Sequence, residues 1–353
     1  MAGLIVPHFH IGKAKPKLSD EIIGHGDYRY RVHKHWGDLD FSKYPVNNCH
    51  EMVMDSKGRL IMIGDEYKNN ILIYDKSGKL LDAWGTSHPG GHGLSIHNEG
   101  GEDFLYLADA GWHINHKGQN VRNAGRITKT TTDGRVIFDI GHPQTIGVYD
   151  PSDPFCPTET AIGPNGDIYI ADGYGKSTIL QYDAQGRFIR MWGGTENEDE
   201  NYNLHTAHGV TIDYRDPDLP LLAVSSRADN VFKFFTLEGQ YVRTLHLPNM
   251  YVCRAVFDDD VMYAGVCWSV PEKETEFDWQ AHTGFMTVLE GDQVVSNPGG
   301  TPPHYVDGAL QKSYQLDTKP IWHGHDVCID EDKNVYVCQW NAEKSYPIKL
   351  ERL

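Results

Sequence analysis

The chain has 353 residues, of which 39% are hydrophobic and 23% are charged, with 36 glycines and 18 prolines. This composition excludes a disordered or collagen-like chain and is typical of a globular protein with many turns. The formal net charge of −17 argues against nucleic acid or an anionic membrane as a partner, because both are negatively charged. The apolar run within residues 1–17 is too short for a signal peptide, and no stretch of the chain has the length of a membrane span, so we expect a soluble, cytoplasmic protein.

Residues 27–37, DYRYRVHKHWG, form the first expected strand, and it ends in Trp36 followed by glycine. The same Trp-Gly ending recurs after Trp84 and Trp192, at the ends of two longer repeats. Within each repeat, short strands with alternating apolar residues are separated by Gly, Asn or Asp turns, which indicates β-strands and not helices.

Six repeats of this kind follow one another along the chain. They span residues 48–85, 90–142, 156–193, 206–247, 249–296 and 323–353. One four-stranded sheet cannot bury both of its faces, whereas six sheets packed radially bury all but their outer edges. The last repeat lacks an outer strand, which residues 27–37 can supply. We therefore predict an all-β, six-bladed β-propeller, one domain over residues 1–353, in which the N-terminal strand closes the ring (a Velcro closure).

One register position of the repeats is rich in histidine. The residue five positions before the first turn of each repeat is, in chain order, His50, His92, Thr158, His208, Cys253 and His325. The first strand of each blade lines the channel of a propeller, so these side chains should converge on its axis. Three imidazoles with one open position form a catalytic zinc sphere, and iron, manganese and nickel also accept imidazole. The register thus predicts a transition metal, with zinc as first choice, bound by at least three of the four histidines.

Four segments carry a resemblance to a known family. The longest is the segment 155–193, which contains IADGYG, and the shorter ones are HGLSI (92–96), AHGVTI (207–212) and GHDVCIDEDKNVYV (324–337). These segments resemble NHL-type six-bladed propellers and, among them, the peptidyl-α-hydroxyglycine α-amidating lyases, also called peptidylamidoglycolate lyases.

The resemblance implies particular roles for residues of this chain. The zinc ligands that it implies are His92, His208 and His325. It further implies that Tyr174 is the general base or proton-transfer group and that Arg227 is an active-site arginine. It also implies a structural calcium ion near Asp326 and the backbone carbonyl of Leu94, which would suit a cation that prefers oxygen ligands.

The sequence also departs from the family pattern. His50 stands where the family has a small residue, Asp65 where it has a second arginine, and His323 where it has a methionine. We therefore treat His50 as a candidate fourth ligand and Asp65 as a candidate catalytic residue, and we expect a different substrate whose carboxylate, if present, is not held in the same way. His323, Thr158 and Cys253 are candidate substrate-binding residues. Cys253 is either a further soft metal ligand or a small apolar channel residue, and we favour the second.

Two further features separate the chain from the family. Cys156 matches a disulfide cysteine of the family, but its partner position is Gly175, so this bridge cannot form and we expect reduced thiols. The insertion at residues 109–125, which contains His113 and His116, is either a cap over the channel mouth or an ordinary surface loop.

We expect a metal-dependent lyase that cleaves the C–N bond of a small carbinolamide or a related α-hydroxy compound. A metal-dependent hydrolase such as a lactonase is the second hypothesis, because a channel metal can also activate water. A protein-interaction scaffold is the third, because a fold does not determine function. The sequence predicts a small-molecule substrate and leaves the oligomeric state open.

Overall fold

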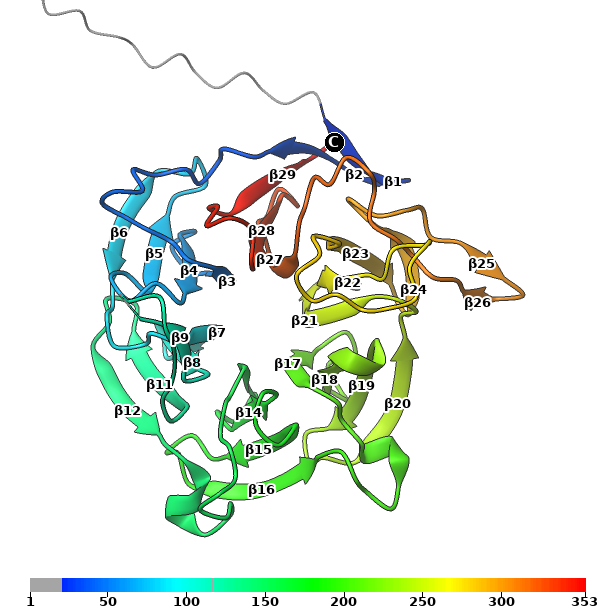
Figure 1. Ribbon diagram of the computed structural model, residues 1–353. Helices are drawn as coiled ribbons and strands as arrows, with labels where there is room; N and C mark the ends of the chain where they lie inside the picture. The colour runs from blue at the N-terminus through cyan, green and yellow to red at the C-terminus, as the bar shows by residue number, and fades with distance from the viewer. Residues whose placement is uncertain (1–20, 116) are drawn as a thin grey trace, which may run out of the picture.

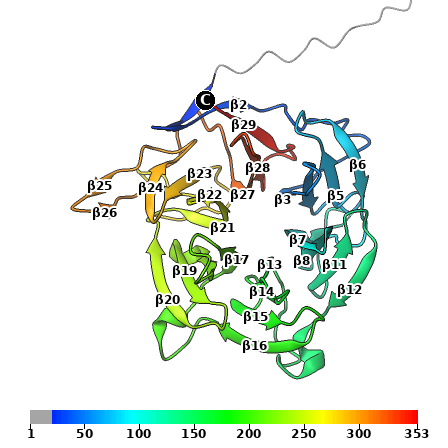
Figure 2. The same ribbon diagram turned by 180° about the vertical axis from the view of Figure 1, so that it is seen from behind.

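The computed structural model describes residues 21–115 and 117–353. Its strands form six sheets arranged radially around a central axis (Figures 1 and 2), which confirms the predicted all-β, six-bladed propeller. The only helices among the described residues are three short 3₁₀ helices, η1 (Pro143–Ile146), η2 (Glu200–Tyr202) and η3 (Arg227–Asp229). In this part of the chain, none is long and apolar enough to cross a bilayer. The interpretation of residues 1–17 and the histidine at position 116 fall outside the described residues.

The first three sheets each contain four antiparallel strands in simple order from the axis outward (Figure 1). The first sheet consists of β3 (Cys49–Met54), β4 (Leu60–Gly64), β5 (Ile71–Tyr74) and β6 (Leu80–Trp84). The second consists of β7 (Gly91–Glu99), β8 (Glu102–Asp109), β11 (Arg126–Thr131) and β12 (Val136–Ile140). The third consists of β13 (Glu159–Ile162), β14 (Ile168–Asp172), β15 (Thr178–Tyr182) and β16 (Phe188–Gly193).

The fourth and fifth sheets repeat this arrangement. The fourth consists of β17 (Ala207–Asp213), β18 (Leu221–Ser226), β19 (Val231–Thr236) and β20 (Tyr241–His246). The fifth consists of β21 (Tyr251–Asp258), β22 (Val261–Trp268), β23 (Phe285–Glu290) and β24 (Gln293–Ser296). Two small hairpins extend from the ring, β9 (Trp112–Ile114) with β10 (Asn120–Arg122), and β25 (Tyr305–Val306) with β26 (Ala309–Leu310).

The sixth sheet joins the two ends of the chain. It consists of β27 (Gly324–Ile329), β28 (Val335–Gln339), β29 (Ile348–Arg352), β2 (Tyr28–His33) and β1 (Ile22–His25). Strand β2 pairs antiparallel with β29, with Tyr30 opposite Arg352, so the N-terminal strand closes the ring as predicted. The sequence did not predict β1, which covers the outer edge of β2 and gives this sheet a fifth strand.

The predicted closing strand 27–37 is longer than β2, and Trp36 lies beyond its end. The Trp36 ring lies 5.3 Å from the Tyr74 ring and 4.7 Å from the Tyr336 ring, so it bridges the first and sixth sheets. Its Nε1 donates a hydrogen bond to the carbonyl oxygen of Lys76 (2.9 Å). A side chain on Gly78, which has φ +87°, would collide with the Trp36 backbone, so only glycine fits this turn. The recurring tryptophan therefore fastens one blade to the next.

Apolar side chains fill the spaces between neighbouring sheets. Between the fourth and fifth sheets, for example, Phe232, Phe234 and Phe285 are fully buried. Burial of each such side chain contributes about 1.5–3 kcal/mol. The inner strands β3, β13 and β27 are buried at nearly every residue, whereas outer strands such as β16 are partly exposed. The strands that line the channel are therefore held firmly by packing on both faces.

Candidate active site and metal centre

The inner strands share an irregularity at the histidine register. In β3, β7, β17, β21 and β27 the pairing with the next strand shifts at this point, as between Cys49 and Glu51 in β3. Consecutive side chains of a regular strand point to opposite faces, but a bulge bends the strand and re-aims its side chains. Two consecutive residues of each of these strands can therefore reach the channel.

The two sets of residues form two layers. The first, here called the histidine ring, consists of His50, His92, Thr158, His208, Cys253 and His325. The second, here called the charged ring, consists of Glu51, Gly93, Glu159, Gly209, Arg254 and Asp326. Two blades carry glycine in the charged ring because their backbones approach a neighbour closely. A Cβ on Gly93 would lie 2.5 Å from the carbonyl oxygen of Thr158, and one on Gly209 would lie 2.7 Å from the Cα of Arg254.

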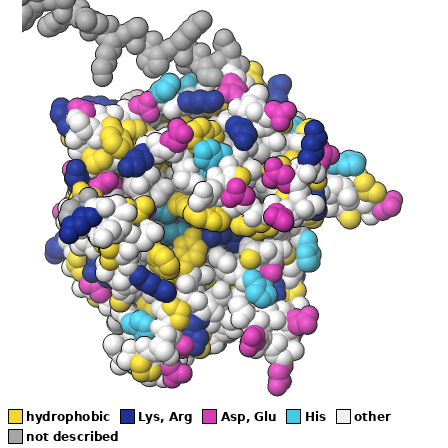
Figure 3. All heavy atoms as spheres, in the orientation of Figure 1, with side chains coloured by type: hydrophobic (Ala, Val, Ile, Leu, Met, Phe, Trp, Pro, Cys, Tyr) yellow, Lys and Arg dark blue, Asp and Glu magenta, His cyan; other side chains and the backbone are white. Residues whose placement is uncertain are grey.

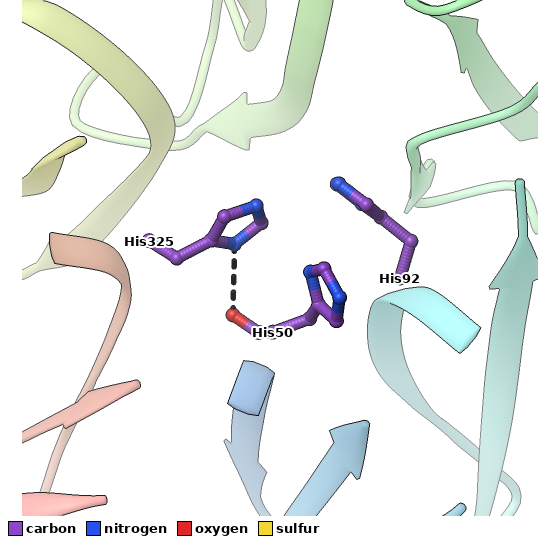
Figure 4. Close-up of side chains that lie close together, drawn as sticks. All are labelled: His50, His92 and His325. Atoms are coloured by element: carbon purple, nitrogen blue, oxygen red, sulfur yellow. Dashed lines mark hydrogen bonds between the residues drawn. The ribbon is translucent and has the colours of Figure 1, made fainter. Parts of the chain in front are cut away.

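The four histidines of the histidine ring lie against one another. The ring centroids of His50 and His92 are 4.6 Å apart, and the centroid of His325 is 4.8 Å from each of them. The centroid of His208 is 4.8 Å from that of His92 and 4.9 Å from that of His325. All four side chains are buried, with at most 5% of the residue exposed. Figure 4 shows His50, His92 and His325 approaching a common space from different sides.

Hydrogen bonds fix the orientation of two of these imidazoles. His92 donates from Nδ1 to the carbonyl oxygen of Thr158 (2.8 Å), and His325 donates from Nδ1 to the carbonyl oxygen of His50 (3.0 Å; Figure 4). Carbonyl partners of this kind set the tautomer of metal-binding histidines and leave Nε2 with its lone pair. Nε2 of His325 and both ring nitrogens of His208 are buried and have no hydrogen-bond partner.

The electrostatic surroundings keep these imidazoles neutral. Burial lowers the pKa of His92, His208 and His325 well below the ordinary value of 6.5. Their neighbours add to this effect, namely the other histidines and the Arg227 guanidinium. A neutral imidazole is the form that binds a metal ion, because its lone pair is free.

The donor atoms fall into two overlapping groups, in each of which all atoms lie within 4.8 Å of one another. One group consists of His50, His92 and His325, and the other of His208, Cys253 and His325. Buried polar atoms normally have a partner, so unpaired imidazole nitrogens beside one another are costly unless a cation lies between them. The histidine ring therefore fits a transition metal, and His50 belongs to it as closely as the three ligands that the resemblance implies.

Tyr174 and Arg227 lie beside the histidine ring. Tyr174 follows β14 in a tight loop that is held by Asp172, whose carboxylate accepts hydrogen bonds from the backbone N–H groups of Cys156 (2.7 Å) and Lys176 (2.9 Å). The Arg227 guanidinium donates from Nη2 to the Tyr174 hydroxyl (3.1 Å).

The Tyr174 hydroxyl also lies 3.2 Å from Nε2 of His92, so it can donate its own hydrogen there. Burial raises the pKa of Tyr174, and the positive charge of Arg227 opposes this rise. Arg227 itself lies between two aromatic rings, with its Cζ 4.9 Å from the Trp268 centroid and 5.5 Å from the Tyr174 centroid. The proposed base and the active-site arginine of the resemblance are thus in direct contact with each other and with the histidine ring.

A cavity of about 510 Å³ opens above the histidine ring. Its wall includes His50, His92, His325, Tyr174, Arg227 and Asp65 together with Trp112, Trp268 and Trp340. Figure 3 shows hydrophobic side chains gathered around a hollow in the middle of one face of the ring. Trp112 comes from the insertion 109–125, which forms the β9–β10 hairpin, so this insertion contributes to the cavity wall.

Asp65, a predicted catalytic residue, is fixed in place by hydrogen bonds. Asp65 accepts hydrogen bonds from Asn47 (3.0 Å) and Asn48 (2.8 Å) and lies 3.6 Å from Nε2 of His50. Burial alone would raise the pKa of Asp65, but the hydrogen bonds from His50 and Asn48 outweigh it and lower the pKa. Asp65 therefore holds His50 and keeps a negative charge at the cavity wall.

Thr158 and His323 do not line this cavity. The Thr158 hydroxyl lies 3.2 Å from the carbonyl oxygens of Ala171 and Ala207, and its own carbonyl orients His92. His323 donates to the carbonyl oxygen of Cys267 (3.0 Å), and burial lowers its pKa to about 4. Thr158 therefore supports His92 from outside the cavity, whereas His323 is buried outside the cavity wall with its Nε2 unpaired.

The charged ring corrects the calcium expectation. The Arg254 guanidinium donates to both carboxylate oxygens of Asp326 (3.1 and 2.7 Å) and to the carbonyl oxygen of Leu94 (2.9 Å). It also lies within 3.8 Å of the buried carboxylates of Glu51 and Glu159. The oxygens of Asp326 and Leu94 do not fit a calcium ion, because the guanidinium already binds them and would repel a second cation. Arg254 supplies the positive charge that the resemblance assigns to calcium.

Sequence reasoning missed the charged ring and the tryptophans. The charged ring stands one position after the histidine register in the same alignment, so its residue types were visible. Strand alternation would place them on the opposite face, and bulges in five of the six inner strands bring them into the channel; Glu159 lies in β13, which has no bulge. Trp268 and Trp340 each stand 15 positions after the histidine-register residue of their blade, the offset at which Asp65 stands in the first blade, so the alignment could have found them. Trp112 lies in the insertion, and no repeat position marks it.

The fold and the site together define a six-bladed propeller with a buried, histidine-rich centre beneath an aromatic cavity. No family model matches the chain. It is 25% identical over 240 residues to a probable peptidyl-α-hydroxyglycine α-amidating lyase of Caenorhabditis elegans, which covers 67% of this chain and 59% of that protein. It is 25% identical over 334 residues to peptidyl-α-hydroxyglycine α-amidating lyase 1 of Drosophila melanogaster, which covers 88% of this chain and 52% of that protein.

The other comparisons agree with the fold. The chain is 26% identical over 182 residues to the human NHL repeat-containing protein 3, which covers half of each chain. A solved structure of a gluconolactonase from Xanthomonas campestris superimposes with a TM-score of 0.55 at 11% identity, covering 97% of this chain and 99% of that one. The chain thus resembles NHL-type propellers and amidating lyases, and it spans between half and three fifths of the length of the two lyases.

Proposed function

We propose that this protein is a metal-dependent lyase of the peptidylamidoglycolate-lyase type, acting on a small carbinolamide or a related α-hydroxy compound. The observation that carries the proposal is the contact of Tyr174 with both Arg227 and His92, at the edge of a buried set of unpaired imidazole nitrogens. The sequence similarity to two enzymes named as amidating lyases supports the same class of reaction.

The histidine ring is the proposed metal site, with zinc as first choice and iron, manganese or nickel as alternatives. When bound, the metal supplies a positive charge that polarises the substrate oxygen and acidifies the protons near it. No resident calcium ion is proposed, because Arg254 fills that position.

The residues of the chain account for the movement of protons and charge. In a carbinolamide, the hydroxyl proton leaves, the C–O bond becomes a carbonyl, the C–N bond breaks, and nitrogen keeps the electron pair and gains a proton. Tyr174 accepts the hydroxyl proton and returns it to the leaving nitrogen. Arg227 favours the ionised form of Tyr174 through its hydrogen bond and stabilises the negative charge that develops beside it.

The cavity wall indicates which substituent the substrate carries. Three tryptophans present apolar surface, and Asp65 stands where a second arginine is expected in the amidating lyases. The wall therefore combines apolar surface with the negative charge of Asp65 and the positive charge of Arg227. We propose an uncharged substrate with an apolar substituent, because Asp65 would repel a carboxylate near His50.

The test is product analysis with the purified protein and a synthetic, uncharged carbinolamide. A lyase releases one amide and one aldehyde in equal amounts, and Tyr174→Phe is expected to lower kcat by about 10²–10⁴-fold, as loss of a general base does. Tyr214→Phe is the matched control, because Tyr214 lies against the cavity at the opposite end of the channel. Retained activity in Tyr174→Phe would overturn the assigned role.

The same purified protein distinguishes the second hypothesis. A metal-dependent lactonase consumes water and yields a single hydroxy acid from a lactone, with no amide or aldehyde. Turnover of lactones without turnover of any carbinolamide would replace the lyase proposal with this one.

A further inference from the structure

Cys253 belongs to the histidine ring by position and by contact. It lies in β21 at the register position that carries histidine in four other blades, and it is fully buried. Its Sγ lies within 4.8 Å of a ring nitrogen of His208 and of His325, and those two nitrogens are equally close to each other. The sequence left open whether this residue is a ligand or an apolar part of the wall.

The surroundings of the sulfur favour a ligand. Its contacts with Nη1 of Arg227 and with the carbonyl oxygen of Gly324 are both long, at 3.9 Å, and its remaining neighbour is the Cys267 thiol. Both nitrogens of His208 and Nε2 of His325 lack hydrogen-bond partners. Three buried donor atoms thus face one another, and each has a free electron pair.

We infer that Cys253 is a metal ligand, binding the ion together with His208 and His325. This inference rests on the metal site of the proposed function. It changes the donor set from imidazole alone to a mixture of nitrogen and sulfur. Sulfur ligands disfavour manganese, which prefers oxygen, so the inference removes manganese from the four candidate metals and keeps zinc as first choice.

The neighbouring Cys267 provides an internal control. It lies in β22, is fully buried beside Cys253 and lines the cavity above the histidine ring, yet it belongs to neither group of donor atoms. A general effect of removing a buried thiol would appear in Cys253→Ala and in Cys267→Ala alike. A ligand effect would appear in Cys253→Ala alone.

The experiment is X-ray absorption at the zinc edge on the full-length protein loaded with one equivalent of zinc. We expect a sulfur scatterer at about 2.3 Å beside nitrogen scatterers at about 2.0–2.1 Å. The sulfur shell should disappear in Cys253→Ala and persist in Cys267→Ala. If Cys253→Ala fails to fold, the spectrum of the unmodified protein still decides whether sulfur binds the metal.

The outcomes separate this inference from the proposed function. Bound zinc with only nitrogen and oxygen neighbours would overturn the role of Cys253 and leave the metal-dependent lyase in place. A sulfur shell that is lost in Cys267→Ala instead would also overturn it. A protein that binds none of zinc, iron, manganese and nickel would overturn both.

Discussion

The charged ring and the histidine ring are neighbouring layers of the same channel, and their residues are one position apart in the sequence. The two layers stabilise their buried polar groups in different ways. The charged ring contains three carboxyl groups around the single positive charge of Arg254, and burial raises the pKa of all three, so protonation also limits their negative charge. The histidine ring contains four buried imidazoles, and several of their nitrogens have no partner. The first layer carries a cation of its own, whereas the second offers donors to an added one. A shift of one position therefore separates a structural layer from a candidate reactive one.

The difference follows from the chemistry of the two groups. A carboxylate is costly to bury without a cation, so three of them require a permanent positive charge nearby. An imidazole can be buried in its neutral form, because its pKa is near neutrality and falls on burial. The protein can thus bury four neutral histidines close together without a counter-charge. Four ionised carboxylates in the same place would require one.

The largest expected effect comes from removing a donor of the histidine ring. In His208→Ala we expect metal content to fall from about one ion per chain to nearly none. Activity should fall by more than about 100-fold, because even residues that only support a metal ligand affect activity by 10–100-fold. Elemental analysis and product formation are the measurements. His246→Ala, at an exposed histidine on β20, is the control, and an equal loss in that variant would contradict the assignment.

The next effect tests whether Arg254 is the cation of the charged ring. Arg254→Ala leaves Glu51, Glu159 and Asp326 without their counter-charge, and we expect a loss of about 3–5 kcal/mol in the free energy of unfolding. Denaturant titration measures it. Calcium should restore part of the loss in the variant, because carboxylate and carbonyl oxygens are calcium ligands, and should leave the unmodified protein unchanged.

Arg187→Ala is the control for this variant, because Arg187 forms an exposed pair with Asp183 and should contribute less than about 1 kcal/mol. A calcium requirement in the unmodified protein would contradict the role given to Arg254.

The two rings should also respond to pH in opposite directions. The folded pKa of the buried histidines is depressed below 6.5, so only the unfolded chain takes up their protons and stability falls as pH decreases below this value. The folded pKa of Asp326 is raised to about 7 from 3.8, so the folded chain holds a proton that the unfolded chain has lost, and stability falls as pH rises between these values. The two effects overlap in the unmodified protein.

Glu51→Gln separates them, because burial and the neighbouring Glu159 raise the pKa of Glu51 well above its ordinary value. In metal-free protein, we expect this variant to gain about 1 kcal/mol or more relative to the unmodified chain as pH rises from about 5 to about 8. Denaturation curves across this range are the measurement. A gain that is larger at acidic pH would show that the sign is wrong.

The smallest effect concerns the cavity above the histidine ring. Trp112→Ala removes one aromatic wall, and we expect KM for an apolar substrate to rise about 5- to 10-fold with little change in kcat, because apolar contacts of this size are worth about 1–3 kcal/mol. Ile114→Ala, on the same hairpin and similarly exposed, is the control. A fall in kcat without a change in KM would assign Trp112 to the chemical step.

Much of this molecule could be predicted from its sequence. The repeats and their alternating apolar residues predicted the six blades, and the Trp-Gly endings predicted closure by the N-terminal strand. The histidine register predicted the convergence of His50, His92, His208 and His325. These features repeat from blade to blade, so each occurrence supports the others.

The parts that could not be predicted depend on single, non-repeated contacts. The bulges override strand alternation and bring Arg254 into the channel, and this placement turns an expected calcium site into an ion pair. Trp112 reaches the cavity from an insertion that no other blade has. Thr158 and His323 lie outside the cavity wall, and hydrogen bonds with carbonyl groups far away in the sequence help to set where their polar atoms point.

The closure of the ring has a consequence for the metal centre. His325 and His50 lie on opposite sides of the seam where the last blade meets the first, and they are 275 positions apart in the chain. An ion bound by both histidines would cross-link the first and last blades. By thermodynamic linkage, an ion that binds the closed ring more tightly than an opened ring must stabilise the pairing of β2 with β29. The stability of the pairing between the two chain ends and the affinity of the histidine ring for the ion are then thermodynamically coupled, so a change in one changes the other.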